Sequence, residues 1–271
     1  SGLSWSLLDG GTTKMPQLSA AIAKKPITAL LWGHSGFGKT SLWGLMARHK
    51  ELYPIYCLDF DLRIDSLKVI LTEEEMSRIC FNSFRDVKIQ GEAAVAAMSL
   101  ANNVLAIDKK YGMEFKTIVA DSGSFLMASF MNRCLFLNGT KPQASTPTLP
   151  DYMAQMSMTT EFVSKLCGSG KNFIFTCHEK NLKDEVLGGV HKTVDMTGDK
   201  TPDRIPGYFN ELWHCEIAQK AGAENRFVVR TKSSLIYMAR TTFRSLDPVE
   251  EQAGIWPKVV KELFGEGSQV N

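Results

Sequence analysis

The segment ITALLWGHSGFGKT, from Ile27 to Thr40, limits what this chain can fold into more than any other stretch. An apolar run rich in strand-forming residues leads directly into G-x-x-x-x-G-K-T, the spacing of a phosphate-binding loop placed after a strand. Glycines let such a loop fold closely around phosphate groups, with backbone N–H groups pointing inward. The residues that follow have helical spacing, and the N-terminus of a helix favours an anion. The segment therefore predicts a nucleoside triphosphate site.

The fixed positions of this loop have predicted roles. Lys39 brings a positive charge to the β- and γ-phosphates, and the Thr40 hydroxyl is a predicted ligand of Mg²⁺. His34, inside the loop, occupies a position at which the motif allows any residue. The residues expected to line the nucleotide are Gly33, His34, Ser35, Gly36, Phe37, Gly38, Lys39, Thr40 and Ser41.

The composition is that of an ordinary globular protein, with 44% hydrophobic and 22% charged residues in a chain of 271. A net charge of +2 does not by itself indicate nucleic acid, although a local groove can still be basic. The six cysteines form no C-x-x-C pair and predict buried thiols in a reducing compartment. No apolar run approaches the roughly 20 residues needed to span a bilayer, so we expect a cytosolic-type protein without membrane segments.

Strand-like apolar runs alternate with helical patterns along the chain, which predicts an α/β fold with a mostly parallel central sheet flanked by helices. The expected strands are 27–32, 52–61, 79–84, 115–120 and 172–177, followed by closing strands at 213–219, 226–231 and 235–239. The expected helices are 41–49, 66–78, 92–110, 126–137, 152–167 and 257–264. Because the closing strands lack long helices between them, we expect an antiparallel extension at one edge.

Two long loops interrupt this pattern. One covers 138–150 and contains three prolines, and the other covers 181–207 and has room for a hairpin. No internal repeat or domain linker is visible, so we predict one ATPase-type core at 27–245. An N-terminal extension at 1–26 precedes it, and a C-terminal helix and tail at 246–271 follow it.

Acidic residues follow two predicted strands at the edge where ligands bind in parallel sheets. Asp121 ends the strand TIVAD and is the predicted partner of Mg²⁺, although an Asp there can also cap the next helix. Asp59 and Asp61 end the second strand on the same side of it, because side chains alternate along a strand. Either could orient the water that attacks the γ-phosphate, and the alternative is a pair of solvated loop acids.

Two further groups could complete the site. His178 and Glu179 follow the strand NFIFTC at the same edge, in a place suited to sensing the γ-phosphate. The alternative is a structural histidine held by hydrogen bonds. Arg230 and Lys232 alternate along the segment VVRTK, so both point to one face of the strand. In oligomeric ATPases a cation from a neighbour commonly completes the site, and the alternative is an exposed face with ordinary basic residues.

The order of these motifs resembles that of the RecA-like P-loop ATPases, and most closely the small phage-encoded RecA-like ATPases associated with single-strand annealing. The resemblance covers about residues 27–245 and rests on the segments GHSGFGKTS, YCLDFDLRID, TIVADSGSFL, FTCHEK and VVRTK. It implies a RecA-like fold, and ATP and Mg²⁺ as cofactors.

The resemblance also implies roles for single residues. Asp61 stands at the position of the family's catalytic glutamate, and Asp65 at a position near the adenine. His178 occupies the place of the nucleotide-sensing residue. Arg230 and Lys232 are implied to reach the nucleotide of a neighbouring subunit, which makes the protein a homo-oligomer with nucleotide at its subunit interfaces.

The function implied by the resemblance is a Mg²⁺-dependent ATP hydrolase that binds single-stranded DNA for strand annealing or exchange in phage-type recombination. Its implied setting is the cytoplasm of a phage-infected or prophage-bearing cell, with a single-strand DNA-binding protein as a further partner. The two long loops correspond to DNA-contacting loops, where backbone phosphates would be held by charge. The residues implied to contact DNA are Lys141, Lys180, Lys183, Lys192, Lys200 and Arg204.

Two other functions fit the same motifs. One is a different P-loop DNA motor, such as a helicase or a packaging ATPase. The other is a non-catalytic scaffold switched by nucleotide, which stays open because Asp61 is one methylene shorter than the family's glutamate.

Overall fold

A nine-stranded sheet forms the middle layer of the part of the chain that the computed structural model describes. The described residues are 25–88, 90–139, 146–183, 189–198, 200–219 and 225–265. The strands are β1 (Thr28–Gly33), β2 (Ile55–Asp59), β3 (Ile79–Ser83), β4 (Thr117–Asp121), β5 (Asn172–Lys183), β6 (Val190–Val194), β7 (Glu211–Ala218), β8 (Arg226–Arg230) and β9 (Val249–Glu251). Their order in the sheet is β3-β2-β4-β5-β1-β7-β8-β9, and β6 pairs with β5 outside this path.

Every neighbouring pair from β3 to β7 in this order is parallel, and β8 and β9 continue the sheet as antiparallel strands. This arrangement confirms the predicted sheet with its antiparallel edge. Strands β1, β2 and β4 are buried along their whole length, as strands covered on both faces should be. Because the strands are parallel, the carboxyl ends of β1, β2, β4 and β5 meet at one edge of the sheet.

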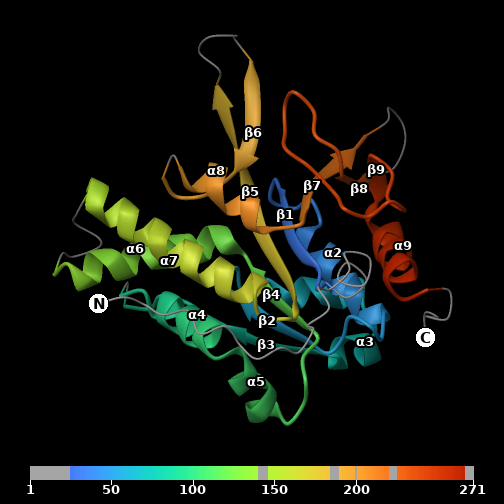
Figure 1. The fold of residues 1–271 in the computed structure, drawn as a ribbon, viewed down its shortest axis with the longest axis horizontal. Coiled ribbons are helices and arrows are strands. Elements are labelled where there is room, and N and C mark those ends of the chain that lie inside the picture. The colour runs from blue at the N-terminus through green and yellow to red at the C-terminus, as the bar shows by residue number, and fades with distance from the viewer. Residues whose placement is uncertain are drawn as a thin grey trace, which may run out of the picture.

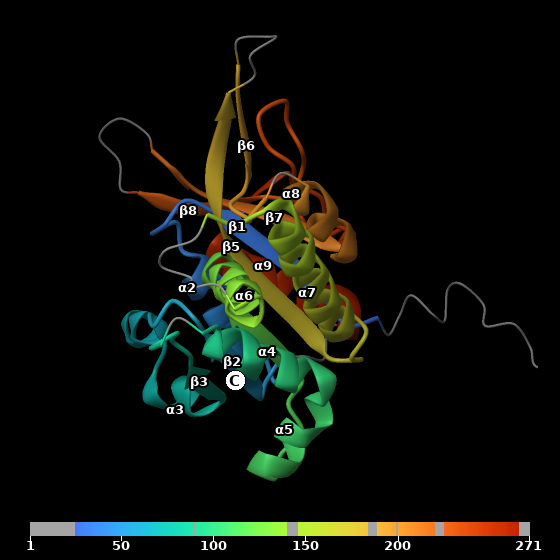
Figure 2. The ribbon, with the colours of Figure 1, turned by 90° about the vertical axis from the view of Figure 1, so that its left-hand side faces the viewer.

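Helices cover both faces of the sheet, as Figures 1 and 2 show. The long helices are α4 (Glu92–Asn102), α6 (Gly123–Leu137) and α7 (Leu149–Cys167) on one face, and α9 (Gln252–Phe264) on the other, beside α2 (Lys39–Gly44). The shorter helices are η1 (Leu45–Arg48), η2 (Ile64–Val69), α3 (Glu73–Ser77), α5 (Val104–Tyr111), α8 (Thr201–Arg204) and η3 (Ile205–Tyr208). None of the helices within the described ranges has the length and apolar character that crossing a membrane requires.

Two of the predicted helices are broken by polar residues. The single helix predicted at 66–78 is wrong. The structure has two separate helices there, η2, which ends at Val69, and α3, which begins after Thr72. Thr72 and Glu75 form a reciprocal capping box there, which starts a new helix. The helix predicted at 92–110 divides into α4 and α5 at Asn103, whose backbone is not helical.

The strand predicted at 235–239 is also wrong. Two isolated bridges are found there, which join Tyr237 to Lys192 and Arg240 to Leu212. Strand β9 is not among the predicted strands, and β5 is longer than predicted. Strand β5 continues to Lys183 and pairs with β6, so the predicted loop at 181–207 contains the hairpin for which it has room. This hairpin stands out from the body of the molecule in both Figures 1 and 2.

Helix α9 ties the C-terminal part of the described chain to the phosphate-binding segment. Trp256 is buried, and its Nε1 donates to the carbonyl oxygen of Leu42 in α2 at 2.6 Å. The Trp256 ring also packs against Trp213 of β7, with ring centroids 5.4 Å apart. Residues that are far apart in the sequence are therefore brought together at the Trp256 side chain.

We expect Trp256→Ala to lower the free energy of unfolding by about 3–5 kcal/mol, because it empties a buried site and leaves the Leu42 carbonyl without its donor. Chemical denaturation followed by circular dichroism measures this change. Phe264→Ala, at an exposed position of the same helix, is the matched control and should change stability by less than about 1 kcal/mol. Equal effects of the two substitutions would contradict the role assigned to Trp256.

Candidate nucleotide-binding site

The phosphate-binding loop lies between β1 and α2, as the sequence predicts. Lys39 is buried, and its Nζ donates hydrogen bonds to the carbonyl oxygens of Gly33 and His34, each at 2.9 Å. Burial lowers the pKa of Lys39, while the carboxylates of Asp121 and Asp61 oppose this shift. The loop therefore holds one desolvated cation at its centre, where phosphate oxygens could replace the two carbonyls as its partners.

Two glycines of the loop are required, Gly33 by its surroundings and Gly38 by its positive φ. A Cβ on Gly33 would lie 2.3 Å from the carbonyl oxygen of Cys215, so a larger residue would force β1 and β7 apart. Gly38 has a φ of +78°, and a Cβ there would meet Gln252 Oε1 at 2.5 Å. Gln252, at the start of α9, also donates through Nε2 to the carbonyl oxygen of Phe37 at 2.9 Å. Helix α9 thus braces the loop from outside.

The Asp121 carboxylate is the point at which three elements meet. Its Oδ2 accepts hydrogen bonds from Thr40 Oγ1 at 2.7 Å and from Trp43 Nε1 at 2.8 Å, both in α2. Its Oδ1 accepts one from Thr176 Oγ1 in β5 at 2.5 Å. A hydroxyl oxygen and a carboxylate oxygen in contact form the hard oxygen set that Mg²⁺ prefers. The geometry fits the predicted ion, with Thr40 as ligand and Asp121 behind it.

Asp61 lies beside Asp121. Ser122 Oγ donates to Asp61 Oδ1 at 2.6 Å, and His178 Nε2 lies 3.5 Å from Asp61 Oδ2. The backbone N–H of Asp61 donates to the carbonyl oxygen of Asp121 at 3.2 Å. Burial raises the pKa of Asp61, but hydrogen bonds from His178 and Ser122 outweigh burial and bring that pKa below its usual value. Asp61 is therefore ionised at neutral pH, the state in which a carboxylate can orient water.

Asp59, the other acid at the end of β2, is held elsewhere. Its carboxylate accepts hydrogen bonds from Ser83 Oγ in β3 at 2.9 Å and from the backbone N–H of Arg63 at 3.3 Å. Burial raises the pKa of Asp59. Of the two acids, Asp61 is the one whose carboxylate contacts Ser122 and lies next to His178.

The other predicted site residues have contacts of their own. Asp65 is exposed on η2 and pairs with Lys68 at 2.5 Å. Arg230 donates through Nε to Glu216 Oε1 at 2.7 Å, and 33% of its side chain is exposed. Lys232 is exposed, and its side chain has no partner within the described residues. Their roles toward the adenine and toward a neighbouring subunit stay predictions.

Three of the lysines predicted to contact DNA lie on the β5–β6 hairpin. Asn181 faces Lys192 across the two strands, so Lys183 and Lys192 lie on one face of the hairpin and Lys180 on the other. Lys183 is exposed, whereas Lys192 pairs with Glu179 at 3.1 Å. The remaining predicted contacts are Lys200 and Arg204, both exposed at α8, and Lys141, which lies outside the described residues.

Three residues of the site are absent from the sequence prediction: Trp43, Thr176 and Gln252. Thr176 has a visible signal, because it is a polar residue inside the buried strand NFIFTC. Trp43 reads as an apolar helix residue, and its indole N–H has a partner only in the folded chain. Gln252 is 215 residues from Phe37, so no local pattern indicates their contact.

Comparison with known proteins identifies the family. The sequence profile of a family described as "AAA domain" matches residues 25–243, and the chain belongs to this family. Among solved structures, an ATPase from the type III secretion system of pathogenic bacteria matches with a TM-score of 0.50 at 12% identity. That match covers 72% of this chain and 54% of the other, so the chain spans about half the length of that ATPase.

A second solved structure, the RadB recombinase, gives a TM-score of 0.41 at 14% identity and covers 75% of this chain and 79% of that one. A search of curated proteins finds no match. The family and the first structural likeness confirm the predicted RecA-like P-loop ATPase fold.

We expect Asp121→Asn to raise the Mg²⁺ concentration needed for half-maximal use of nucleotide by about tenfold or more, because a positioning group behind a metal ligand is lost. A Mg²⁺ titration at fixed nucleotide concentration measures this shift. Binding of nucleotide without Mg²⁺, measured in the same buffer, is the control and should change little. An unchanged Mg²⁺ requirement would count against this role of Asp121.

We expect Asp61→Asn to lower kcat for ATP hydrolysis by about 100-fold, because an amide cannot take up a proton from water. Nucleotide affinity should stay within about threefold, because Asp61 does not belong to the loop. Asp59→Asn is the matched control, since Asp59 ends the same strand and faces Ser83 instead. A larger loss of turnover in the Asp59 variant would reverse the assignment.

Proposed function

We propose that this protein is a Mg²⁺-dependent ATP hydrolase in which Asp61 orients the attacking water. The observation that carries the proposal is the convergence of four groups at the carboxyl ends of four parallel strands. These groups are Lys39 after β1, Asp61 after β2, Asp121 at the end of β4 and His178 in β5. Phosphoryl transfer needs positioning and electrostatic stabilisation, which such a set supplies.

In this proposal, Lys39 holds the β- and γ-phosphates, and Thr40 and Asp121 hold the Mg²⁺ ion that neutralises their charge. His178 Nε2 lies 3.5 Å from Asp61 Oδ2, and in this proposal His178 senses whether a γ-phosphate is present. Its ring also packs edge-on against Phe125, with ring centroids 5.9 Å apart, which limits its movement. Asp65 is assigned to the neighbourhood of the adenine.

We infer that the protein assembles with nucleotide between subunits, and that Arg230 and Lys232 act on the neighbour's nucleotide. Arg230 is the last residue of the antiparallel strand β8, and Lys232 lies two residues beyond it; part of Arg230 is exposed, and Lys232 is exposed. A cation supplied by a neighbour stabilises the charge that develops in the transition state.

We further propose that the ATPase acts on single-stranded DNA in phage-type recombination, by strand annealing or exchange, with a single-strand DNA-binding protein as partner. The support is the motif order together with the protruding β5–β6 hairpin, which continues from the strand that carries His178. Exposed basic residues lie on and near it. A contact of this kind would hold the DNA backbone and would be independent of sequence.

The experiment that tests the central proposal is ATP hydrolysis by Lys39→Ala. Loss of the buried cation should reduce hydrolysis to background, since the phosphates lose their main positive partner. Lys50→Ala, an exposed lysine shortly after the same helical segment, is the matched control and should hydrolyse ATP like the unchanged protein. Tight ATP binding without turnover in the unchanged protein would instead favour a nucleotide-switched scaffold.

Binding of single-stranded DNA is tested by fluorescence anisotropy across a salt series, with and without ATP and Mg²⁺. We expect nucleotide-dependent binding, and the slope of log K against log salt should fall by about 0.7 for each phosphate contact removed. Lys183→Gln should lower the slope in this way, and Lys109→Gln on α5 serves as control. Duplex unwinding coupled to hydrolysis would favour the alternative of a DNA motor.

A further inference from the structure

A chain of charged and polar side chains crosses the sheet next to the nucleotide site. At its centre is His214 of β7, which is fully buried. Its Nε2 lies 2.9 Å from Glu179 Oε2, and its Nδ1 lies 3.9 Å from Glu216 Oε2. The other oxygen of each carboxylate takes a cation. Glu179 Oε1 lies 3.1 Å from Lys192 Nζ, and Glu216 Oε1 lies 2.5 Å from Arg230 Nη2.

This row of polar side chains joins two places that the proposed function uses. Glu179 directly follows His178, which contacts Asp61. Arg230, at the other end, is the cation assigned to the neighbour's nucleotide. Strand β1 lies between β5 and β7 in the sheet, so Glu179 and His214 meet across the strand that enters the phosphate-binding loop.

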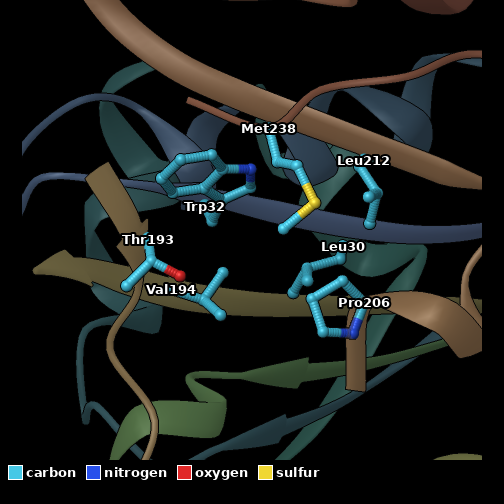
Figure 3. A pocket seen from close by; sticks show the side chains of 7 residues that line it. All are labelled: Leu30, Trp32, Thr193, Val194, Pro206, Leu212 and Met238. Atoms are coloured by element: carbon cyan, nitrogen blue, oxygen red, sulfur yellow. The ribbon is translucent and has the colours of Figure 1, made fainter. Parts of the chain in front are cut away.

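The His214 ring is held from two sides. Trp32, the residue before the loop, lies with its ring centroid 4.3 Å away, and Tyr237 stacks on the ring at 4.7 Å. Beside Trp32 is an almost wholly apolar cavity, which Met238 and Val194 help to line (Figure 3). Its volume is about 10 Å³, too small for more than one water. The imidazole is therefore packed between two rings, and its two nitrogens face the two carboxylates.

The contact between His214 and Glu216 is incomplete. At 3.9 Å it is too long for a hydrogen bond, and His214 Nδ1 has no partner within the described residues. A buried nitrogen without a partner is costly, so a closer approach of Glu216 would be favourable whenever Nδ1 carries a hydrogen. Glu216 thus faces two groups, Arg230 through Oε1 and His214 through Oε2.

A gain in stability does not by itself account for this row of polar side chains. Burial raises the pKa of Glu179, but hydrogen bonds from His214 and Lys192 outweigh burial and lower that pKa below its usual value, so the carboxylate is ionised. A buried polar pair of this kind is often no more stable than apolar residues of the same size, and its neighbours here are apolar. Such a pair instead holds a charged group in a fixed position.

We propose that Glu216 is a positioning residue for Arg230, and that the buried Glu179–His214 pair sets where the Glu216 carboxylate lies. The part of β5 beside Asp61 is thereby linked to the cation offered to the neighbouring subunit. In the isolated subunit Glu216 holds Arg230. A displacement of Glu179 shifts His214 with it, and the Glu216 carboxylate then changes its position relative to Arg230. The functional meaning of this link rests on the proposed role of Arg230 at a neighbour's nucleotide.

The link is tested in the isolated protein without nucleotide, by the hydrogen-exchange rate of the Arg230 Nε–H group measured by NMR. Glu216→Gln should speed this exchange by about tenfold, because the ionic acceptor is lost. Glu179→Gln and His214→Gln, which do not touch Arg230, should each speed it by about threefold. Glu251→Gln is the matched control, because Glu251 accepts from Arg226 on the same strand, and it should leave the rate unchanged.

Circular dichroism establishes that each variant is folded. Lys192→Gln, at the partly exposed end of the chain, takes the place of any buried variant that is not folded, and it should also change the Arg230 rate. Unchanged Arg230 exchange in the folded variants of Glu179, His214 and Lys192 would overturn the proposal.

ATP hydrolysis as a function of protein concentration separates this proposal from the proposed function. If Arg230→Ala leaves assembly-dependent hydrolysis unchanged while Glu179→Gln still alters Arg230 exchange, the link stands and the intersubunit role of Arg230 fails. If Arg230→Ala lowers hydrolysis while Glu179→Gln alters neither readout, the link alone fails. Where both hold, Glu216→Gln should change assembly-dependent turnover by about threefold or more, and Glu251→Gln should not.

Discussion

The three hydrogen bonds to the Asp121 carboxylate are the contact on which the nucleotide site depends. They join α2, β4 and β5, elements that come from three separate parts of the chain. A buried carboxylate is tolerated only when donors replace its lost hydration, and here the donors also fix the position of Thr40. The same strand end supplies a backbone carbonyl to Phe60 and Asp61. The proposed metal position and the acid proposed to orient water are therefore both held by one residue and its immediate contacts.

The parallel sheet explains why so few contacts suffice. Because β2 and β4 pair with Asp59 opposite Asp121, the residues just beyond these strands are brought together by register alone. The same holds for Gly33 of β1 and His178 of β5. Local hydrogen bonds then choose between similar groups. Ser122 donates to Asp61 and Ser83 donates to Asp59. Burial prevails at Asp59 and raises its pKa, whereas hydrogen bonds from His178 and Ser122 prevail at Asp61 and lower its pKa.

The sequence was sufficient wherever the information is local. Apolar runs predicted the strands of the parallel sheet, and fixed spacing predicted the loop and the acids that follow the strands. The break at Thr72 was also readable, since T-x-x-E is a capping-box pattern. The segment 235–239 was mistaken for a strand because its residues suit one, whereas the fold uses Tyr237 to cover His214. Tertiary packing overrides propensity there.

Partners that are distant in the sequence could not be predicted. Trp43, Thr176 and Gln252 reach the site through contacts that no spacing encodes, and the polar chain around His214 needs the strand order to become visible. His214 looks in the sequence like one polar residue between Trp213 and Cys215 in an apolar strand. In the fold it becomes a buried ring between two carboxylates. A local conflict with the apolar pattern is what a functional position looks like from the sequence, and both Thr176 and His214 show it. Polar residues inside buried strands near the phosphate-binding loop are therefore the strongest sequence signals of functional positions outside the recognised motifs.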